Sequence, residues 1–411
     1  MTQRQLVIRA VTLFARFSRP QAATRDIKDI REAGHRLRDL LQQAGFEVQT
    51  LRVALDGFTP WGHNLDQVMD EVAHLLQVLG PAFFVNLGVV HPEDSQGYAW
   101  LPEIMRRFRV YASARLVAPG ETRITGRAIW AAARLIRALT TVGAKGEGNT
   151  RLAASAWVPP YTPFFPAAYA DPQGPSSWTW ALALETGGLL ASAAFEGGSL
   201  DTVESRLRQG LEEETAAIAA LLERHHPEMW ARFHGFDISW APYPARERSV
   251  GAAMEALLGR LPGGHGTLAL SAWLTGVLRR AHIPKRTGFC GLMLPVLEDP
   301  YLARAVAEGL MDTRTLLLHS AVCGVGLDTV PLPGDVTEAQ LAAVLWDVAA
   351  LAVRLRKPLA ARIIPVPGYG PGDWVRWEEN KFFTDTPILP LPGTERGGLG
   401  EDVVLDLSAS G

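Results

Sequence analysis

Short apolar runs rich in β-branched and aromatic residues alternate with longer segments of helical periodicity along most of the chain. The runs at 6–14, 82–90 and 110–118 have the composition of buried strands. Between and after such runs, apolar residues recur every three or four positions and predict helices over 24–45, 65–79 and 125–142. Repeated strand–helix units of this kind favour an α/β fold, in which helices cover one or both faces of parallel strands.

The pattern continues toward the C-terminus. A long helix is predicted after Asp201, and the clearest helix spans 337–355, where apolar residues fall on one face. Further strands are predicted at 46–53, 152–158, 180–185, 234–242, 288–297, 315–323 and 359–367. No Gly/Ser-rich linker divides the chain, so we expect a single α/β domain over residues 1–390 and a loosely ordered tail over 391–411.

Composition narrows the class of protein. The chain has 411 residues and a net charge of −3, and no basic tract points to nucleic acid or an anionic membrane surface. The N-terminus has no small-residue cleavage site, and no apolar run is long enough to cross a membrane. Two distant cysteines without a spacing framework are typical of a reduced compartment. We therefore expect a cytoplasmic protein.

The stretch SAVCGVGLDTVPLPGD places a thiol beside free backbone amides and a carboxylate. Cys323 is the candidate nucleophile, the amides near Gly324 and Gly326 could bind a developing anion, and Asp328 could orient a base or hold a cation. The alternative is that Cys323 simply packs in the core, as free cysteines often do. His319 is a possible base, although on the predicted strand it would lie roughly 13 Å from Cys323.

Polar residues that interrupt apolar strands form the second set of candidates. Arg362 lies within LAARIIPVP and Glu185 ends WALALE, while Asn149 and Arg151 begin a strand after a glycine-rich loop. A substrate-binding cavity would produce this pattern, but so would satisfied core groups, including an ion pair between Arg362 and Glu185 or another acid. Asn86 is a further polar residue of this kind.

Three weaker candidates remain. The loop PGYGPGD after the last strand could use Gly368 to approach a ligand. Asp335 resembles the start of a capping box with Glu338. A divalent cation held by Asp328, Asp335 or Asp373 is possible, but no metal, nucleotide or haem signature is present. The apolar segment at 161–169 predicts either a lid over a pocket or an oligomer contact, possible in a homodimer.

Several blocks together identify a family. RTGFCGLMLPVLEDPYLARA, LLLHSAVCGVGLDTVPLPGD, RLRKPLAARIIPVPG, NTRLAASAWVPPYTPFFPAAY and GFEVQTLRVAL resemble the domain-of-unknown-function family DUF711. The resemblance implies a fold similar to pyruvate formate-lyase and other glycyl radical enzymes, a ten-stranded α/β barrel of two five-stranded halves. In those enzymes a cysteine meets a glycine inside the barrel, and Cys323 and Gly368 could take these places. Because Pro367 precedes that glycine and the radical signature is absent, radical chemistry is not expected.

These residues favour a hydrolase- or lyase-type enzyme that acts on a small anionic metabolite inside the barrel, with Cys323 as the key residue. Arg362 or Arg151 would bind a carboxylate or phosphate. The rival hypothesis is a ligand-binding or regulatory protein that retains the barrel without its chemistry.

Overall fold

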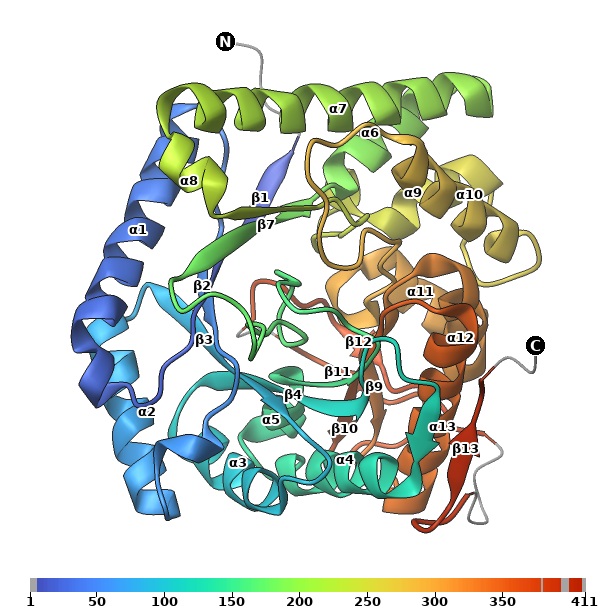
Figure 1. Ribbon diagram of the computed structural model, residues 1–411. Coiled ribbons are helices and arrows are strands. Elements are labelled where there is room, and N and C mark those ends of the chain that lie inside the picture. Colours follow the sequence, from blue (N-terminus) through green and yellow to red (C-terminus); the bar gives the residue numbers. More distant parts are fainter. Residues whose placement is uncertain (1–5, 378–379, 393–398, 409–411) are drawn as a thin grey trace.

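A nine-stranded mixed sheet organises the computed structural model, which describes residues 6–377, 380–392 and 399–408 (Figure 1). Its order is β8-β7-β1-β2-β3-β4-β6-β10-β9. The strands are β1 (Val7–Phe14), β2 (Leu51–Ala54), β3 (Phe83–Val90), β4 (Val110–Val117), β6 (Leu152–Ala156), β7 (Thr179–Glu185), β8 (Phe233–Asp237), β9 (Gly326–Pro333) and β10 (Leu359–Val366).

Strand directions divide the sheet into a central set and two flanking pairs. β1, β2, β3, β4 and β6 are mutually parallel. β7 pairs with β1 and β10 pairs with β6 in the antiparallel sense, while β7 is parallel to β8 and β10 is parallel to β9. The expected α/β class with mostly parallel strands is confirmed.

The segment 286–292 lies between the outer strands of this sheet. Parallel bridges join Phe236 to Arg286, Trp240 to Leu292, and Leu292 to Gly324 just before β9. The Leu292 amide donates to the Cys323 carbonyl over 2.8 Å. The sequence predicted a regular strand over 288–297, but the structure has isolated bridges here, followed by the short 3-10 helix η5 (Val296–Glu298).

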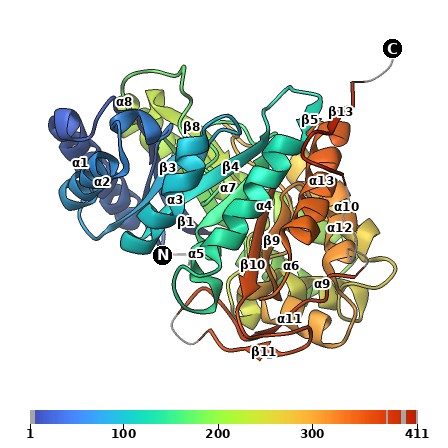
Figure 2. The ribbon, with the colours of Figure 1, turned by 90° about the horizontal axis from the view of Figure 1, so that it is seen from below.

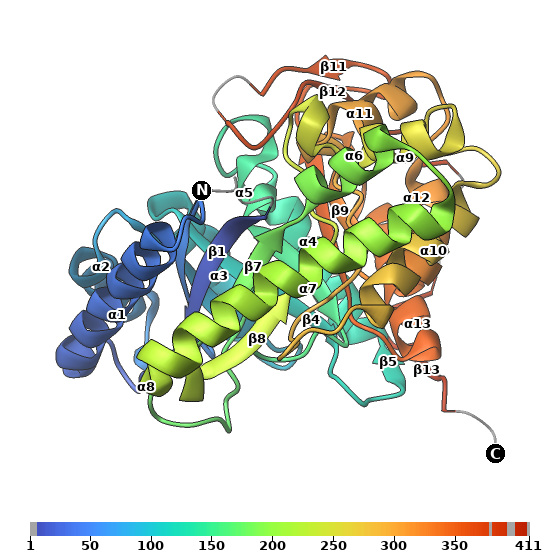
Figure 3. The same cartoon turned by 90° about the horizontal axis from the view of Figure 1, so that it is seen from above.

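Helices lie around the outside of the sheet (Figures 1 and 2). Seen from below, α4 and α13 pack side by side and both contact β10 (Figure 2). Seen from above, α7 runs across β7 and β8 (Figure 3). The α-helices are α1 (Thr24–Gln43), α2 (Leu65–Leu79), α3 (Ser95–Arg107), α4 (Gly126–Leu139), α5 (Glu147–Thr150), α6 (Gly187–Glu196), α7 (Leu200–His225), α8 (Pro227–Ala231), α9 (Val250–Leu258), α10 (Thr267–Arg280), α11 (Pro300–Ala307), α12 (Thr313–Cys323) and α13 (Glu338–Leu355).

Helix α13 confirms the strongest periodicity in the sequence, but its start corrects a detail. Its N-cap is Thr337, whose hydroxyl accepts from the Gln340 amide while the Gln340 side chain accepts from the Thr337 amide. The predicted capping box of Asp335 with Glu338 is therefore wrong. Asp335 is exposed and lies two residues before the true cap.

Helix α12 overturns the predicted strand over 315–323. The Asp312 side chain accepts from the Thr315 amide at 2.8 Å, which fixes the first turn. Gly324 then ends the helix with a φ of 99°. The apolar run between them fits a buried helix as well as a buried strand, so composition could not separate the two.

Two small sheets complete the fold. β11 (Trp374–Val375) pairs with β12 (Thr386–Pro387), and β5 (Arg123–Thr125) pairs with β13 (Val404–Asp406). The predicted tail over 391–411 lies partly outside the described residues. Among the residues that the structure describes, no helix is long and apolar enough to cross a membrane.

Candidate functional site

A cavity of about 610 Å³ lies against one end of the strands. All five central strands contribute residues near their N-terminal ends, and β9 and β10 contribute from the other direction. The loops around 144–151, 164–167, 289–298 and 380–383 complete the lining. The strand residues with polar or aromatic side chains are Arg9, Arg52, Phe84, Tyr111, Asp328 and Arg362. We call this cavity the pocket.

A β-bulge aims the charged side chains of β9 and β10. Leu327 pairs with Ala361 and Val330 pairs with Ile363, so two residues of β9 face one residue of β10. Thr329, inside this irregularity, has a φ of 45°, which is uncommon for a β-branched residue. Bulges beside sites commonly redirect a side chain, and here the register shift carries Asp328 toward Arg362.

A second irregularity lies at Arg9. The pairing of β1 with β7 shifts between Ile8 and Ala10, and Arg9 is the residue between them. Arg9 is buried and reaches Glu185 at the end of β7. The irregularity in β1 places Arg9 at the boundary between the central strands and β7. The irregularity between β9 and β10 places Arg362 within a flanking pair.

Six charged side chains form one connected series of ion pairs in which positive and negative groups alternate. We call this series the ionic chain. It links Arg248 to Glu185, Glu185 to Arg9 at 3.3 Å, Arg9 to Glu298 at 2.7 Å, Glu298 to Arg362 at 2.6 Å, and Arg362 to Asp328 at 2.8 Å. Its three arginines and three carboxylates balance in charge.

The sequence left two roles open for Arg362, a substrate contact and a structural ion pair, and the ionic chain bears on this choice. Its Nε donates to Asp328 Oδ1 at 2.9 Å and its Nη2 donates to Glu298 at 2.6 Å. The structural ion pair is present, with Glu298 and Asp328 as the partners. Glu185, the partner named in the sequence analysis, binds Arg9 and Arg248 instead.

Burial and the neighbouring charges have opposite effects on the pKa values of Asp328, Glu185 and Arg362 in the ionic chain. Burial raises the pKa of Asp328 even though Arg362 attracts the ionised form. Burial likewise raises the pKa of Glu185 against the attraction of Arg9. For Arg362, burial opposes the charge, but the carboxylates of Asp328 and Glu298 hold its pKa above the ordinary value. Burial therefore increases the proton affinity of Asp328, a carboxyl of the pocket lining.

Arg52 differs from the other strand arginines of the pocket. Its Nε donates to the Thr50 hydroxyl at 3.0 Å, and its guanidinium lies 5.0 Å from the centre of the Phe165 ring. Among the described residues, neither Nη atom has a protein acceptor and no carboxylate pairs with the side chain. Burial and the positive charge of Arg9 lower the pKa of Arg52 to about 9, so Arg52 remains cationic at neutral pH.

Aromatic rings surround this cation. Tyr111 lies 5.2 Å from Phe165 and 6.1 Å from Phe84, measured between ring centres. Phe84 is the register partner of Arg52 on the next strand. Phe164, Phe289, Trp377, Phe382 and Phe383 also line the cavity. The pocket thus combines an uncompensated positive charge with an extensive apolar surface.

The segment 161–169 runs along the inner side of the sheet. Its residues 164–167 line the pocket. The Thr12 hydroxyl donates to the Pro163 carbonyl at 2.9 Å, and the Asn86 amide donates to the Pro166 carbonyl at 2.8 Å. This placement fits the predicted cover over a pocket, whereas the predicted oligomer contact stays a prediction. Asn86 is a satisfied core group that fastens the segment.

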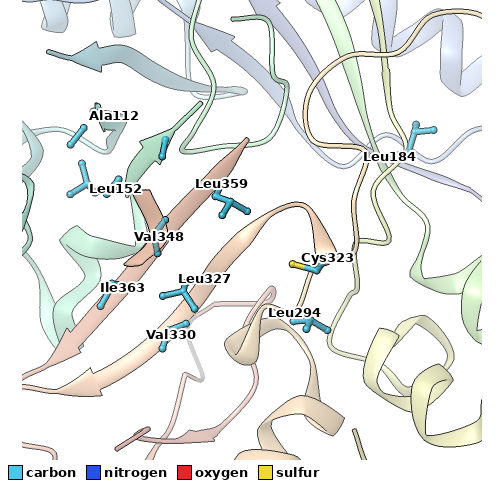
Figure 4. Close-up of a cluster of buried hydrophobic side chains, with 14 of the residues drawn as sticks. Ala112, Leu152, Leu184, Leu294, Cys323, Leu327, Val330, Val348, Leu359 and Ile363 are labelled. Carbon is cyan, nitrogen blue, oxygen red and sulfur yellow. The ribbon is translucent and has the colours of Figure 1, made fainter. Parts of the chain in front are cut away.

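Cys323 lies away from the pocket lining. It is the last residue of α12, is 1% exposed, and sits among buried hydrophobic side chains that include Leu294 and Leu327 (Figure 4). The structure therefore separates the thiol from Asp328, with which the sequence analysis grouped it. This arrangement matches the packing alternative for Cys323.

The position predicted for His319 relative to Cys323 is also wrong. Because α12 is a helix, His319 and Cys323 are one turn apart, and the separation of roughly 13 Å expected on a strand does not apply. His319 is 2% exposed, and neither ring nitrogen has a hydrogen-bond partner within the described part of the chain. Burial lowers the pKa of His319, which favours the neutral ring.

The candidate glycines shape turns. Gly326 has a φ of 106°, and an added Cβ would lie 2.2 Å from the Ala360 carbonyl oxygen, so only glycine fits against β10 there. Gly324 ends α12. Gly368 lies in the turn after β10 with a φ of 80°. None of the three is part of the pocket lining formed by described residues.

Arg151 and Asn149 have different roles in the structure. Arg151 lines the pocket, but its Nη1 donates to the Phe108 carbonyl at 2.9 Å and its Nε is 3.7 Å from Glu147. Asn149 is buried beneath the lining and donates to the Ile136 carbonyl at 3.0 Å, which satisfies the end of α4. Asn149 therefore holds a helix end, and the prediction that it contacts substrate finds no support in its position.

The weak metal candidates do not gather. Asp328 is held by Arg362, Asp335 is exposed, and Asp373 accepts from the Gly370 amide at 2.7 Å within its own turn. Across the described ranges, no group of three or more histidine, cysteine, aspartate or glutamate side chains could hold a metal ion.

Sequence reasoning missed three members of the ionic chain and Arg52. Arg9 and Arg52 interrupt apolar strands just as Arg362 does, so the same signal would have found them. Glu298 and Arg248 lie in short 3-10 helices between larger elements, where charged residues are ordinary. No local pattern marks those two.

Comparison with known proteins gives consistent matches over most of the chain. The family described as "Uncharacterised ACR (DUF711)" matches residues 1–379. A UPF0210 protein of Pyrobaculum arsenaticum is 28% identical, and the match covers 96% of this chain and 95% of that protein. A UPF0210 protein of Pyrobaculum islandicum is 30% identical over 72% of this chain and 65% of its own length. A UPF0210 protein of Listeria monocytogenes is 36% identical over 38% of this chain and 35% of its own length.

Proposed function

We propose that this chain, which belongs to the uncharacterised DUF711 family, is an enzyme that binds a small organic anion at Arg52 and transfers a proton through Asp328. The observation that carries the proposal is the state of Arg52. This arginine is partly buried in the pocket, and no carboxylate of the described chain forms an ion pair with it. A desolvated cation of this kind gains most from a ligand that supplies the missing negative charge.

Asp328 is the group best suited to move a proton. Both contacts with Arg362 use Oδ1, and Oδ2 accepts no hydrogen bond from the described residues. The free oxygen belongs to a carboxyl whose pKa burial has raised, which brings its proton affinity closer to that of a general acid or base at neutral pH. Hydrolase- or lyase-type chemistry through such a carboxyl needs no nucleophilic thiol.

A non-catalytic ligand-binding protein is the second candidate. The observation in its favour is that Arg9, Glu298, Asp328 and Arg362 already neutralise one another in the ionic chain. A pocket whose buried charges are largely paired in this way can bind an anion without reacting with it.

The finer description of the fold is part of the same proposal. The bridges of segment 286–292 to Phe236, Trp240 and Gly324 support its role as a tenth strand between β8 and β9. With that strand, five strands would run in each direction around a barrel of the glycyl-radical-enzyme type. A cytoplasmic location and a homodimer are likewise proposals that rest on the sequence alone.

Thermal stability in the presence of anions tests the binding step. The wild type, Arg52→Met and Arg109→Met should be compared by scanning fluorimetry against a panel of organic anions. Arg109 also lines the pocket but is exposed, so its replacement removes the same charge without touching the buried cation. We expect anions that stabilise the wild type to stabilise Arg109→Met equally and to lose their effect on Arg52→Met. Full stabilisation of Arg52→Met would contradict the proposal.

Asp328→Asn separates the enzyme from the binding protein. The amide keeps an oxygen for Arg362 but cannot accept a proton. If the protein is an enzyme, Asp328→Asn should bind a stabilising anion and fail to convert it, as followed by mass spectrometry of the mixture. Wild-type protein that binds but never converts any stabilising anion would favour the second candidate.

A further inference from the structure

We infer that the ligand of the pocket is a monocarboxylate that carries an apolar, ring-sized body. This inference rests on the proposed function and narrows it to one class of anion. It follows from the charge balance of the lining, the donors that Arg52 leaves open, and the aromatic residues around them.

The charge balance favours a single negative charge. The ionic chain contains three arginines and three carboxylates, so it contributes no net charge to the pocket. Arg52 adds one positive charge, while Arg151 is paired with Glu147. The other cations of the lining, Arg109, Lys145 and Lys381, are exposed to solvent. A monoanion therefore neutralises the buried part of the pocket, whereas a dianion would leave one excess negative charge there.

The open donors favour a planar head group. Because Nε of Arg52 is used by the Thr50 hydroxyl, the two Nη groups remain for a ligand. Two parallel N–H groups of one guanidinium match the two oxygens of a carboxylate. The Arg52 guanidinium carbon lies 5.0 Å from the centre of the Phe165 ring, within the range of a cation–π contact.

The surroundings of the fork favour an apolar body. Phe84 stands opposite Arg52 in the strand register, Tyr111 packs edge-on against Phe84, and Phe165 lies against Tyr111. Phe289 and Met293 extend the apolar lining from the loop before η5. A ring in contact with such side chains is stabilised by burial and by edge-to-face packing.

The space agrees with a body of this size. A cavity of about 610 Å³ is far larger than acetate or inorganic phosphate requires. Such volumes are typical of pockets that enclose most of a small organic molecule. Small anions without a body would leave the aromatic surface in contact with water.

Matched pairs of ligands test the head group and the body separately. Isothermal titration calorimetry should compare benzoate with phenylphosphonate, phenylacetate with benzylphosphonate, and acetate with methylphosphonate. Benzamide provides an uncharged counterpart of benzoate. Measurements at about pH 8 make the phosphonate heads largely dianionic while Arg52 stays charged. The proteins are the wild type, Arg52→Met, Arg38→Met and Phe84→Ala.

We expect benzoate or phenylacetate to bind at least about tenfold more tightly than the phosphonate with the same body, and benzamide not to bind. Arg52→Met should weaken the aryl carboxylate at least about tenfold, while Arg38→Met, which lies outside the pocket lining, should not. Phe84→Ala should weaken the aryl carboxylate but leave acetate unchanged. Circular dichroism of each variant checks that the fold is intact.

Two outcomes would overturn the inference, and they are distinguishable from failure of the proposed function. If phosphonates bind more tightly than carboxylates and lose affinity in Arg52→Met, the anion site stands but its class is wrong. If acetate binds as tightly as benzoate, the apolar body is wrong. If no anion in the set shows a dependence on Arg52, the proposed function itself fails.

Discussion

Arg362 and Arg52 occupy the same pocket, yet their surroundings differ completely. Arg362 is held by two carboxylates and is one member of a balanced series of ion pairs. Arg52 has a hydroxyl and an aromatic ring for neighbours, and no carboxylate among the described residues. An arginine in an apolar strand therefore does not reveal its role by itself. Its role follows from whether the fold supplies the opposite charge or leaves it to a ligand.

The largest effect should come from removing the shared cation of the ionic chain. Arg362→Met leaves Asp328 and Glu298 without their common partner, and an unpaired buried charge typically costs about 3–5 kcal/mol. We expect urea unfolding to show a loss of that size. The matched control is Arg38→Met, which breaks an exposed pair with Asp39 and should cost about 1 kcal/mol or less.

A second substitution sharpens this prediction. In the Arg362→Met background Glu298 still pairs with Arg9, so Asp328→Asn removes the carboxylate that has lost its ion-pair partner and should recover part of the lost stability. If Arg362→Met unfolds at the same urea concentration as the wild type, the ionic chain has no structural role and the contrast with Arg52 disappears.

Arg52→Met should give the opposite result for stability. Since no described carboxylate depends on Arg52, we expect the free energy of unfolding of the ligand-free protein to change by no more than about 1 kcal/mol in either direction. The measurement is again urea unfolding, under the conditions used for Arg362→Met. A loss of unfolding free energy comparable to that of Arg362→Met would mean that Arg52 also stabilises the fold.

Asp328 offers a smaller effect that depends on pH. Burial raises its pKa in the folded state above the unfolded value, so the folded protein holds the proton to higher pH. The ionised carboxyl therefore disfavours folding above the folded pKa, and this penalty disappears as pH falls toward the unfolded pKa. Relative to Asp328→Asn, the wild type should gain stability as pH is lowered from about 7 to about 4. Thermal melts across this range would show an opposite trend if Arg362 dominated.

The thiols should show the least response of all. Cys323 is 1% exposed, and burial raises the pKa of Cys290 to about 12. We expect both to react slowly with iodoacetamide in the native protein and quickly in urea, as counted by mass spectrometry. Rapid labelling of Cys323 in the native protein would contradict the packing role and make the thiol a candidate reactive group again.

Sequence patterns predicted the elements with strong periodicity and missed those fixed by side-chain hydrogen bonds. β3 and β4 interrupt long helical segments with β-branched runs, and α13 has a regular apolar face, so all three were predictable. The apolar run of α12 lacks such a period, and its helical state depends on the cap at Asp312. The 288–297 segment has strand composition, but its first residues bind the buried Asp237 carboxylate, which accepts from the Phe289 amide at 2.7 Å.

The candidate site was predictable where charge interrupts an apolar strand and where polar groups gather in one short stretch. Arg362 was found in the first way and Asp328, beside Cys323 and its glycines, in the second, and the two side chains do meet in the pocket. Cys323 was not separable from a core cysteine, because a thiol beside glycines has the same sequence whether it faces a cavity or a helix interface. Glu298 comes to Arg9 from far along the chain, and only the folded sheet brings them together.

The most direct test of the central claim is to locate an anion in the pocket without choosing the ligand. A crystal of the wild-type protein soaked in iodide would reveal bound anions by their anomalous scattering. The account predicts an iodide in contact with the two Nη groups of Arg52 and none at Arg362, whose charge is already paired. Iodide at Arg362 with Arg52 unoccupied, or no iodide anywhere in the pocket, would contradict it.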